Sequence, residues 1–408
     1  MSIQGHKKLL FVSQYFYPES FRGNDIAFDL ARRGMEVTVL CGTPNYPAGK
    51  FFKGYGWFKR NKEEINGVKV IRIPIIPRGS SSLTLLLNYL SYAINASFFL
   101  LFHLIRNYYD VCFIQQLSPV TIVVPGVLWK KLTRRPLVTW VLDLWPESLQ
   151  SAGGIKNKYV LNFFGAVAKS EYKNADKILV SSKDFQKSIC EKGDFFSKIT
   201  YYPNWAEDSF KEKREVQLPS LPKGFLVMFA GAVGEAQDFD HIVEAAKTFK
   251  GSEVKFVILG DGRKKDWVEE QIKKEALQDN LFLLGRYPIE YMPTFFEKAD
   301  IMLVSLKDEL IFNLTVPAKI QAYMSVGKPI IAMINGAGAE LVKEAKCGIA
   351  VPAENPNELQ KAIIKLQSMN KAELAAMGDN GKMYCEQHFS KEKSMEKLYH
   401  LLNEELCN

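Results

Sequence analysis

The stretch Asn313-Leu-Thr-Val-Pro-Ala-Lys-Ile-Gln-Ala-Tyr-Met-Ser-Val-Gly-Lys-Pro-Ile-Ile-Ala332 predicts a loop, a helix and a buried strand, in that order. Thr315 is a suitable N-cap, and Pro317 fits the first helical turn, where a missing N–H costs nothing. Gly327 ends the helix, and the apolar run that follows begins a strand. Unpaired amides at the helix start can face an anion, with Lys319 beside them. An ordinary helix-to-strand connection with a solvated Lys319 explains the same pattern.

Short apolar runs recur through both halves of the chain, with helical patterns between most of them. Such alternation predicts parallel sheets covered by helices. The expected fold class is α/β, with two Rossmann-like, doubly wound parallel-sheet domains facing across a cleft. The predicted strands are Leu9 to Ser13, Glu36 to Leu40, Val68 to Ile73, Val111 to Ile114, Leu137 to Leu142 and Lys177 to Val180, then Phe225 to Phe229, Lys255 to Leu259, Leu281 to Leu284, Ile301 to Val304, Ile330 to Ala332 and Gly348 to Val351.

A charged stretch with Pro219 and Pro222 separates the two sets of strands. It predicts a linker over 207–224, after a first domain over 1–206 and before a second over 225–385. Residues 386–408 are expected to form a C-terminal helix that crosses back to the first domain.

The composition is that of a globular protein, with 47% hydrophobic and 24% charged residues among 408. The six cysteines are dispersed, with no C-x-x-C pair and no histidine at metal-ligand spacing. Disulfide frameworks and zinc sites are therefore poorly supported, and a reducing cytoplasm is favoured. The apolar run after Lys7 and Lys8 is too short for a secretory signal and predicts a first buried strand.

The first half of the chain is basic. Residues 1–203 carry 27 Lys and Arg against 14 Asp and Glu, within a net charge of +8 for the whole chain. Between Lys50 and Lys62 the basic residues are interleaved with aromatic ones, which suits a lipid headgroup layer. Aromatics that stack on nucleic acid bases give the same pattern. We expect an anionic membrane surface as the partner, and no nucleic acid.

The longest apolar segment, Leu83 to Ile105, is long enough to cross a bilayer. Asn88, Asn95 and His103 interrupt it, so we interpret it as a helix that lies partly in the core and partly against a membrane. A transmembrane span and a plain core helix are the alternatives. Peripheral attachment to the inner face of the cytoplasmic membrane is expected.

Two glycine turns follow predicted strands of the second half. Phe229 to Gly234 leads from a strand toward a helix, and Gly260-Asp-Gly262 is followed by Arg263. Glycines at such turns let backbone amides approach a phosphate, and a basic side chain there can reach an anion. Neither turn matches a P-loop, and the first strand is not followed by G-x-G-x-x-G, so ATP and NAD sites have little support.

A set of ordered motifs spans nearly the whole chain. The motifs are Asp143-Leu-Trp-Pro-Glu147, Pro203-Asn-Trp205, Gly231 to Asp238, Gly260-Asp-Gly262, Gly285-Arg286 and Val316 to Pro329. Together they resemble the family 4 glycosyltransferases, which are retaining enzymes of the GT-B fold. Within that family the sequence is most similar to the bacterial capsule and O-antigen branch that includes fucosaminyl (6-deoxy-N-acetylhexosamine) transferases.

The resemblance implies retaining transfer of a sugar from a UDP-sugar held mainly by the second domain, with no catalytic metal and no other cofactor. By position, Gly231 and Gly234 line the diphosphate loop. Arg286 and Tyr287 border the base, and Lys319 faces the phosphates. The implied substrate-binding set also includes Glu235, Thr315 and Val316.

The sequence departs from the family where the sugar is held. Family members usually place two glutamates eight positions apart, one near the donor sugar and one on the ribose, and Leu314 and Ala322 occupy these positions. The basic pair usual after the first strand of this domain is absent as well. We therefore assign the phosphate charge to Lys319 and Arg263, and take Glu340 as the substitute ribose ligand.

In the first domain, three acids are candidates to act on the acceptor hydroxyl. Asp143 and Glu147 follow a predicted buried strand, where a carboxylate can orient or deprotonate the acceptor. Glu19 and Arg22 lie in the loop after the first strand, where family members approach donor phosphate and acceptor. Gln116 is expected to bind the donor sugar. Alternatively, Asp143 caps a helix, Glu147 is solvated and Gln116 ends a strand, and the leaving phosphate itself takes the acceptor proton.

The expected acceptor is a polyprenyl-diphosphate-linked saccharide, because a basic, aromatic domain with a semi-polar apolar helix suits a substrate in the inner leaflet. The resemblance implies transfer of N-acetyl-L-fucosamine or another N-acetylhexosamine in capsule or O-antigen synthesis. The alternatives are a soluble sugar acceptor, a UDP-N-acetylhexosamine 2-epimerase of the same fold and a non-catalytic, membrane-associated assembly subunit.

Overall fold

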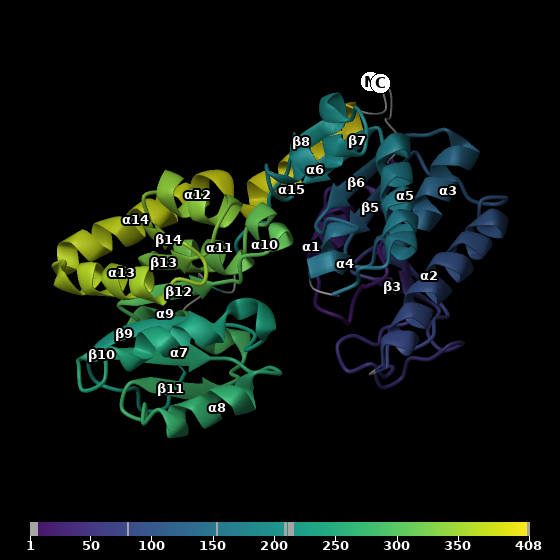
Figure 1. Cartoon of the computed structure of the whole chain (residues 1–408). Coiled ribbons are helices and arrows are strands. Elements are labelled where there is room, and N and C mark those ends of the chain that lie inside the picture. Colours follow the sequence, from purple (N-terminus) through teal and green to yellow (C-terminus); the bar gives the residue numbers. More distant parts are fainter. Residues whose placement is uncertain (1–6, 80, 152–153, 208–209, 211–215, 406–408) are drawn as a thin grey trace. The chain divides into compact units, whose positions relative to one another are not determined.

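The chain divides into two compact units, which Figure 1 shows in a computed structural model. Unit 1 comprises Met1–Tyr202 with Glu392–Asn408, and unit 2 comprises Pro203–Lys391. The structure describes residues 7–79, 81–151, 154–207, 210 and 216–405. Residues 208–209 and 211–215 of the expected linker lie outside this described part.

Unit 1 is built on an eight-stranded sheet in the order β3-β4-β2-β1-β5-β6-β7-β8. Neighbouring strands are parallel, except that β3 runs antiparallel to β4. The six strands expected in this half are present, and β3 and β8 add to them. The strands are β1 (Lys8–Val12), β2 (Glu36–Gly42), β3 (Lys62–Ile65), β4 (Val68–Ile73), β5 (Val111–Gln116), β6 (Leu137–Val141), β7 (Lys177–Val180) and β8 (Ile199–Tyr201).

The helices of unit 1 connect these strands, and the expected apolar helix is present as α2. Its N-terminus is fixed by a capping box, in which the Ser81 hydroxyl accepts from the Thr84 amide. The last helix, α15, packs on unit 1: the Ser394 carbonyl accepts from the Tyr202 hydroxyl at 3.0 Å, and Glu392 pairs with Arg33 at 2.6 Å. The helices are α1 (Arg22–Arg32), α2 (Ser82–His103), α3 (Val124–Thr133), α4 (Glu147–Ser151), α5 (Lys158–Asn174), α6 (Phe185–Glu191) and α15 (Lys391–His400), with a π-helical turn at Leu401–Glu405.

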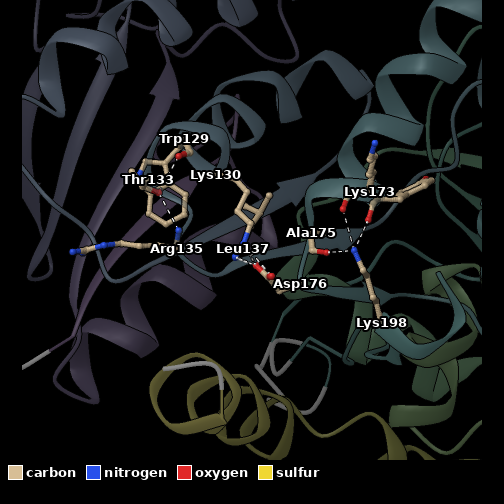
Figure 2. Close-up of polar contacts among 10 residues, drawn as sticks. Trp129, Lys130, Thr133, Arg135, Leu137, Lys173, Ala175, Asp176 and Lys198 are labelled. Carbon is tan, nitrogen blue, oxygen red and sulfur yellow. Dashed lines mark hydrogen bonds and ion pairs between the residues drawn. The ribbon is translucent and has the colours of Figure 1, made fainter. Parts of the chain in front are cut away.

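Polar contacts tie α3 and α5 to β6 (Figure 2). The Lys130 ammonium, on α3, donates to both Asp176 oxygens at 2.7 and 3.0 Å, and the Leu137 amide at the start of β6 donates to the same carboxylate at 2.7 Å. Lys198 donates to the carbonyls of Lys173 and Ala175 at the end of α5, at 3.0 and 2.8 Å. These contacts satisfy the end of α5 and fix the spacing of the two helices.

Unit 2 is built on a six-stranded sheet in the order β11-β10-β9-β12-β13-β14, in which all pairs are parallel. Alternate strand residues supply two cores, one on each face: Met228 belongs to one, and Val227 and Phe229 belong to the other. The strands are β9 (Phe225–Ala230), β10 (Val254–Leu259), β11 (Leu281–Gly285), β12 (Ile301–Ser305), β13 (Ile330–Met333) and β14 (Gly348–Val351).

Helices cover both faces of this second sheet, since α9, α11, α12 and α14 contribute to the first core and α7 and α13 to the second. The expected α/β class with two parallel-sheet domains is therefore confirmed. The helices are α7 (Phe239–Lys247), α8 (Lys265–Lys274), α9 (Met292–Lys298), α10 (Leu310–Leu314), α11 (Ala318–Ser325), α12 (Ala337–Glu344), α13 (Pro356–Ser368) and α14 (Lys371–His388).

The segment that opened the sequence analysis forms α11 and β13, as predicted, and Gly327 follows the helix with a φ of +69°. The assignment of Thr315 as the N-cap is wrong. Its hydroxyl donates to the Ile311 carbonyl at 2.7 Å, because Thr315 ends a preceding short helix, α10. Pro317 takes the N-cap position of α11 instead, without a side-chain hydrogen bond.

Candidate active site

The carboxyl edge of the unit 2 sheet carries the loops expected to bind a ligand. The chain order reverses at β9, which lies between β10 and β12, and ligands of open α/β sheets bind at such a point. The loops after β9 and β12 are joined there. The Ser305 hydroxyl donates to the Gln237 carbonyl at 2.7 Å, and the Lys307 amide donates to the Ala236 carbonyl at 3.0 Å.

Lys319, on the first turn of α11, reaches into the loop after β9. Its ammonium lies 3.7 Å from the centre of the Phe229 ring, a cation–π contact. Gly231 has a φ of +143°, and a Cβ atom there would lie 2.4 Å from Lys319 Cε. Glycine is thus required at 231 both by the backbone conformation and by the lysine packed on it.

Burial lowers the pKa of Lys319 to about 7. Among the described residues, no carboxylate forms an ion pair with its ammonium. A cation that is withdrawn from water without a counter-ion is unfavourable, so burial increases the fraction of Lys319 that is neutral. An anionic ligand at this site would favour the charged form of Lys319.

Backbone hydrogen bonds join the two glycine turns to each other and occupy some of their amides. The Gly231 amide donates to the Leu259 carbonyl at 2.8 Å, and the Val233 amide donates to the Asp261 carbonyl at 2.9 Å. A Cβ atom at Gly260 would lie 1.8 Å from the Gly231 carbonyl oxygen. These glycines serve close backbone packing and make room for Lys319, so a diphosphate-lining role for Gly231 stays a prediction.

Three other predicted residues, Gly234, Glu235 and Arg263, lie in the loops after β9 and β10. Glu235 is in a 3₁₀ turn, with its carboxylate 3.7 Å from the Lys264 ammonium and 3.5 Å from that of Lys307. Gly234 precedes this turn, and Arg263 is exposed on the loop after β10. The structure thus brings Glu235 to neighbouring lysines.

Four further predicted residues lie on other elements. Arg286 is exposed after β11, and the adjacent Tyr287 packs on Phe295 with ring centres 4.8 Å apart. Val316 is partly buried against the core before α11. Glu340, on α12, is 70% exposed and pairs with Lys343 at 2.9 Å, so its proposed role on the ribose has no support from its contacts.

In unit 1, Glu19 is buried and holds two loops together. Its carboxylate accepts from the backbone amides of Phe16, Asn45 and Tyr46, at 3.3, 2.8 and 2.6 Å. Burial raises the pKa of Glu19 to about 7, against the opposing effect of these hydrogen bonds. The side chain is 2% exposed, so the structure gives it a loop-positioning role, and direct action on a substrate stays a prediction.

Asp143 and Glu147 flank a tight turn at the carboxyl end of β6. Asp143 accepts from the Ser148 hydroxyl and, at 3.3 Å, from the Trp145 indole, and burial raises its pKa. Glu147 is not solvated: one oxygen accepts from the Ser188 hydroxyl at 2.6 Å and pairs with Lys192, and the other is buried without a partner in the described part of the chain. The two carboxylates belong to one short segment but have separate partners.

Gln116 ends β5, and Arg22 begins α1, both at the carboxyl edge of the unit 1 sheet. Gln116 is 1% exposed, and its side-chain oxygen has no hydrogen-bond partner among the residues that the structure describes. An unpaired buried acceptor at a strand end suits a hydroxyl ligand.

Two family descriptions match the chain in succession. Residues 24–205 match the "Glycosyl transferase 4-like domain", and residues 210–383 match "Glycosyl transferases group 1". The chain belongs to the family 4 type of GT-B glycosyltransferases.

Two bacterial proteins illustrate its relatives. It is 28% identical to WbjE of Pseudomonas aeruginosa, named as a glycosyltransferase, over 64% of this chain and 66% of that protein, just under two thirds of its length. It is 26% identical to WcaI of Escherichia coli, named for colanic acid biosynthesis, over 73% of this chain and 75% of that protein.

Two solved structures share the whole fold of this glycosyltransferase. Sucrose-phosphate synthase of Thermosynechococcus elongatus superposes with a TM-score of 0.72 at 15% identity, over 97% of this chain and 98% of that one. Anabaena HepE, crystallised with UDP and glucose, superposes with a TM-score of 0.67 at 17% identity, over 97% and 99%.

Two acids that the sequence reasoning missed follow β12 at the point where the chain order reverses. Glu309 precedes α10, and one of its carboxylate oxygens is buried without a partner among the described residues. Asp308 accepts from the Asn313 amide at 2.8 Å, and hydrogen bonds from Asn313 and Asn335 lower its pKa. The sequence does contain a signal for these acids: they are consecutive and come soon after a buried strand. They also lie shortly before Leu314 and Ala322, which replace the family glutamates.

Proposed function

We propose that this chain transfers a sugar from a UDP-sugar to a polyprenyl-diphosphate-linked saccharide, with retention of the anomeric configuration. The observation that carries the proposal is Lys319, a partly buried cation at the carboxyl edge of the unit 2 sheet with no carboxylate partner among the described residues. A nucleoside diphosphate supplies the missing negative charge. The complex of HepE with UDP and glucose supports a UDP-linked donor.

The donor sugar needs oxygen ligands that Leu314 and Ala322 do not provide. We assign this role to Glu309, whose unpaired carboxylate oxygen follows β12. The name of WcaI, which assigns that protein to colanic acid biosynthesis, supports a role in polysaccharide synthesis. We propose N-acetyl-L-fucosamine or another N-acetylhexosamine as the sugar moved, on the resemblance of the motifs to the capsule and O-antigen branch.

In the proposed reaction, the acceptor oxygen bonds to the anomeric carbon as the bond from that carbon to the diphosphate breaks. UDP leaves with the electron pair, and the acceptor proton goes either to a leaving phosphate oxygen or to Asp143. Lys319 and Arg263 stabilise the charge that develops on the leaving diphosphate. No metal is assigned a part in this step.

The membrane side of the proposal rests on α2. This helix has the length and hydropathy of a membrane span, but only 28% of its apolar window is buried within the protein. Its exposed side chains include Ile94, Phe98 and Phe102, at 64, 63 and 60%. We propose that this face lies in the lipid surface and that attachment to the inner face of the cytoplasmic membrane is peripheral. Release by alkaline carbonate is expected, and retention after carbonate would favour an integral span.

The deciding experiment has two stages. Calorimetry with a panel of UDP- and GDP-sugars, including 6-deoxy-N-acetylhexosamines, should show binding of a UDP-sugar. Transfer to a polyprenyl-diphosphate monosaccharide should then give a product whose anomeric configuration, read by NMR, equals that of the donor. A sugar product formed without any acceptor would favour the epimerase. If the chain binds none of the nucleotide sugars, the non-catalytic subunit is favoured. The absence of the two family glutamates is the specific observation behind this alternative.

A further inference from the structure

An apolar groove of about 440 Å³ lies in the helical layer of unit 1, between α2, α3 and α5. Helix α3 packs against both of the others, as the right-hand part of Figure 1 shows. Leu128 of α3 and Phe163 and Val167 of α5 form its walls, and Ser97 of α2 and Lys131 of α3 are among its few polar neighbours. Its volume is in the range of small-molecule sites.

The walls of this groove are held apart by fixed contacts. The ion pair between Lys130 and Asp176 joins α3 to the residues that follow α5, and Lys198 holds the last carbonyls of α5 (Figure 2). The fully buried Trp129 lies on the inner side of α3. These contacts hold α3 and the end of α5 on two sides of the groove.

The groove is continuous with the apolar face of α2. Ser97 lines it and is followed directly by Phe98, which is 63% exposed, and Leu101 is exposed one turn later. On the opposite wall, Phe163 is 54% exposed. The sequence of α2 contains no Asp, Glu, Lys or Arg. An apolar surface of this extent on a soluble domain marks an interaction site for hydrocarbon or another apolar partner.

A second groove, of about 610 Å³, adjoins the first across Ala166, which lines both. It is lined by one acid, Glu191, and by three lysines, Lys158, Lys169 and Lys192, of which Lys192 is paired with Glu147. Pro146 and Gln150 also line it, so it borders the segment that carries the predicted acceptor carboxylates. An apolar groove thus meets a basic groove beside the predicted acceptor site.

We infer that these adjoining grooves bind one amphipathic molecule, the lipid carrier of the acceptor. Its isoprenoid chain lies between α2, α3 and α5, and its diphosphate lies over Lys158 and Lys169. The charge of the second groove matches an anionic headgroup, and the first groove reaches the face of α2 that the membrane covers. The inference rests on the proposed lipid-linked acceptor and specifies where this chain holds it.

The test uses the full chain and undecaprenyl phosphate, a polyprenyl phosphate, in phosphatidylcholine vesicles. Binding is measured by vesicle flotation with and without the polyprenyl phosphate. The native protein should bind vesicles that contain it at least fivefold more tightly. Val167→Trp, which fills the groove, should abolish this gain. Leu132→Trp, a matched change at an exposed site of α3, should keep it. Thermal melting identifies a variant that fails to fold, in which case Ala166→Leu replaces it.

Two further measurements separate the possible outcomes. Phosphatidylglycerol vesicles test a general anionic surface, and their binding should not change with Val167→Trp. A polyprenyl phosphate with a diazirine in its chain should label peptides of α3 and α5. The inference would be overturned if the polyprenyl phosphate increased vesicle binding equally in Val167→Trp and in the native chain. Labelling confined to elements other than α3 and α5 would overturn it as well. UDP binding by calorimetry tests the donor proposal separately, because it does not depend on the lipid.

Discussion

At the residue scale, Lys319 joins the fold to the proposed chemistry. Its partners are the Phe229 ring and the backbone of Gly231, neither of which carries a negative charge. With its pKa lowered to about 7 by burial, the free protein carries a mixture of charged and neutral lysine at neutral pH. An arriving diphosphate favours the charged form and raises this pKa, so donor binding should take up a proton.

Replacement of Lys319 by Met should weaken UDP binding roughly 10- to 100-fold, because a charge-assisted contact contributes about 1.5–3 kcal/mol. The native affinity should fall from about pH 7.5 to 9, a range in which the phosphates of UDP are already ionised. Calorimetry in buffers of different ionisation enthalpy should detect the proton taken up. Lys343→Met, at an exposed lysine of α12, is the control. A change below twofold, or binding without proton uptake, would contradict the phosphate role.

A second residue prediction concerns Glu19, whose pKa burial raises to about 7 from 4.5. Between these values the folded carboxyl is protonated and the unfolded one is ionised, so stability falls as pH rises through this window. Glu19→Gln should remove a fall on the order of 3 kcal/mol. The buried Glu171, whose pKa is raised to about 8, contributes a pH dependence of stability of its own, which this substitution leaves in place.

The measurement for Glu19 is urea unfolding followed by tryptophan fluorescence at pH 5 and pH 8. Glu36→Gln, at an exposed glutamate of the same unit, should leave the difference between the two pH values unchanged. Equal pH dependence in Glu19→Gln and the native chain would show that the buried carboxyl does not titrate in this range.

At the scale of elements, α2 presents two different faces. Tyr92, Ala96 and Leu100 are buried against the unit 1 core, and the opposite side is apolar but exposed. Double replacement Ile94→Glu with Phe98→Glu should reduce binding to phosphatidylglycerol vesicles at least tenfold, since each large apolar side chain contributes about 1.5–3 kcal/mol when buried. Flotation measures the change. Ile364→Glu, at an exposed position of α13, is the control, and an equal loss there would point to a general charge effect.

The elements also show what the sequence could and could not reveal. Long apolar runs located α2 and all twelve predicted strands, because burial on both faces leaves few polar residues. The edge strand β3 was missed because its sequence, KEEI, is mostly charged and partly exposed. Thr315 was misassigned because α10 precedes it, and nothing local distinguishes a helix end from a helix start there.

Site contacts depended on tertiary structure in a way that motifs do not encode. The packing of Lys319 on Gly231 joins residues far apart in the chain, and the burial of Glu19 arises from two loops that close over it. Glu309 stayed unnoticed because comparison with the family directed attention to Leu314 and Ala322. A residue that replaces a missing ligand need not occupy the position of the one it replaces.

At the scale of the whole molecule, the proposed donor contacts with the nucleotide diphosphate belong to unit 2, and the proposed acceptor contacts belong to unit 1. Substitutions at the diphosphate contacts should therefore change the constants of the donor, and substitutions at the lipid contacts should change those of the acceptor. Loss of Lys319 should raise the Kd of UDP. Loss of the basic groove at Lys158 and Lys169 should raise the KM of the lipid acceptor and leave UDP binding unchanged.

Asp143 provides the sharpest test of this division. Hydrogen bonds from Ser148 and Trp145 hold its carboxyl, and burial raises its pKa, which makes it a stronger base than an exposed aspartate. If it takes the acceptor proton, Asp143→Asn should lower kcat about 100-fold, remove the acidic limb of the pH profile and leave the Kd of UDP unchanged. Asp184→Asn, at an exposed acid of unit 1, is the control. A loss below threefold with an unchanged pH profile would assign the proton to the leaving phosphate and leave Asp143 as the residue that holds the start of α4.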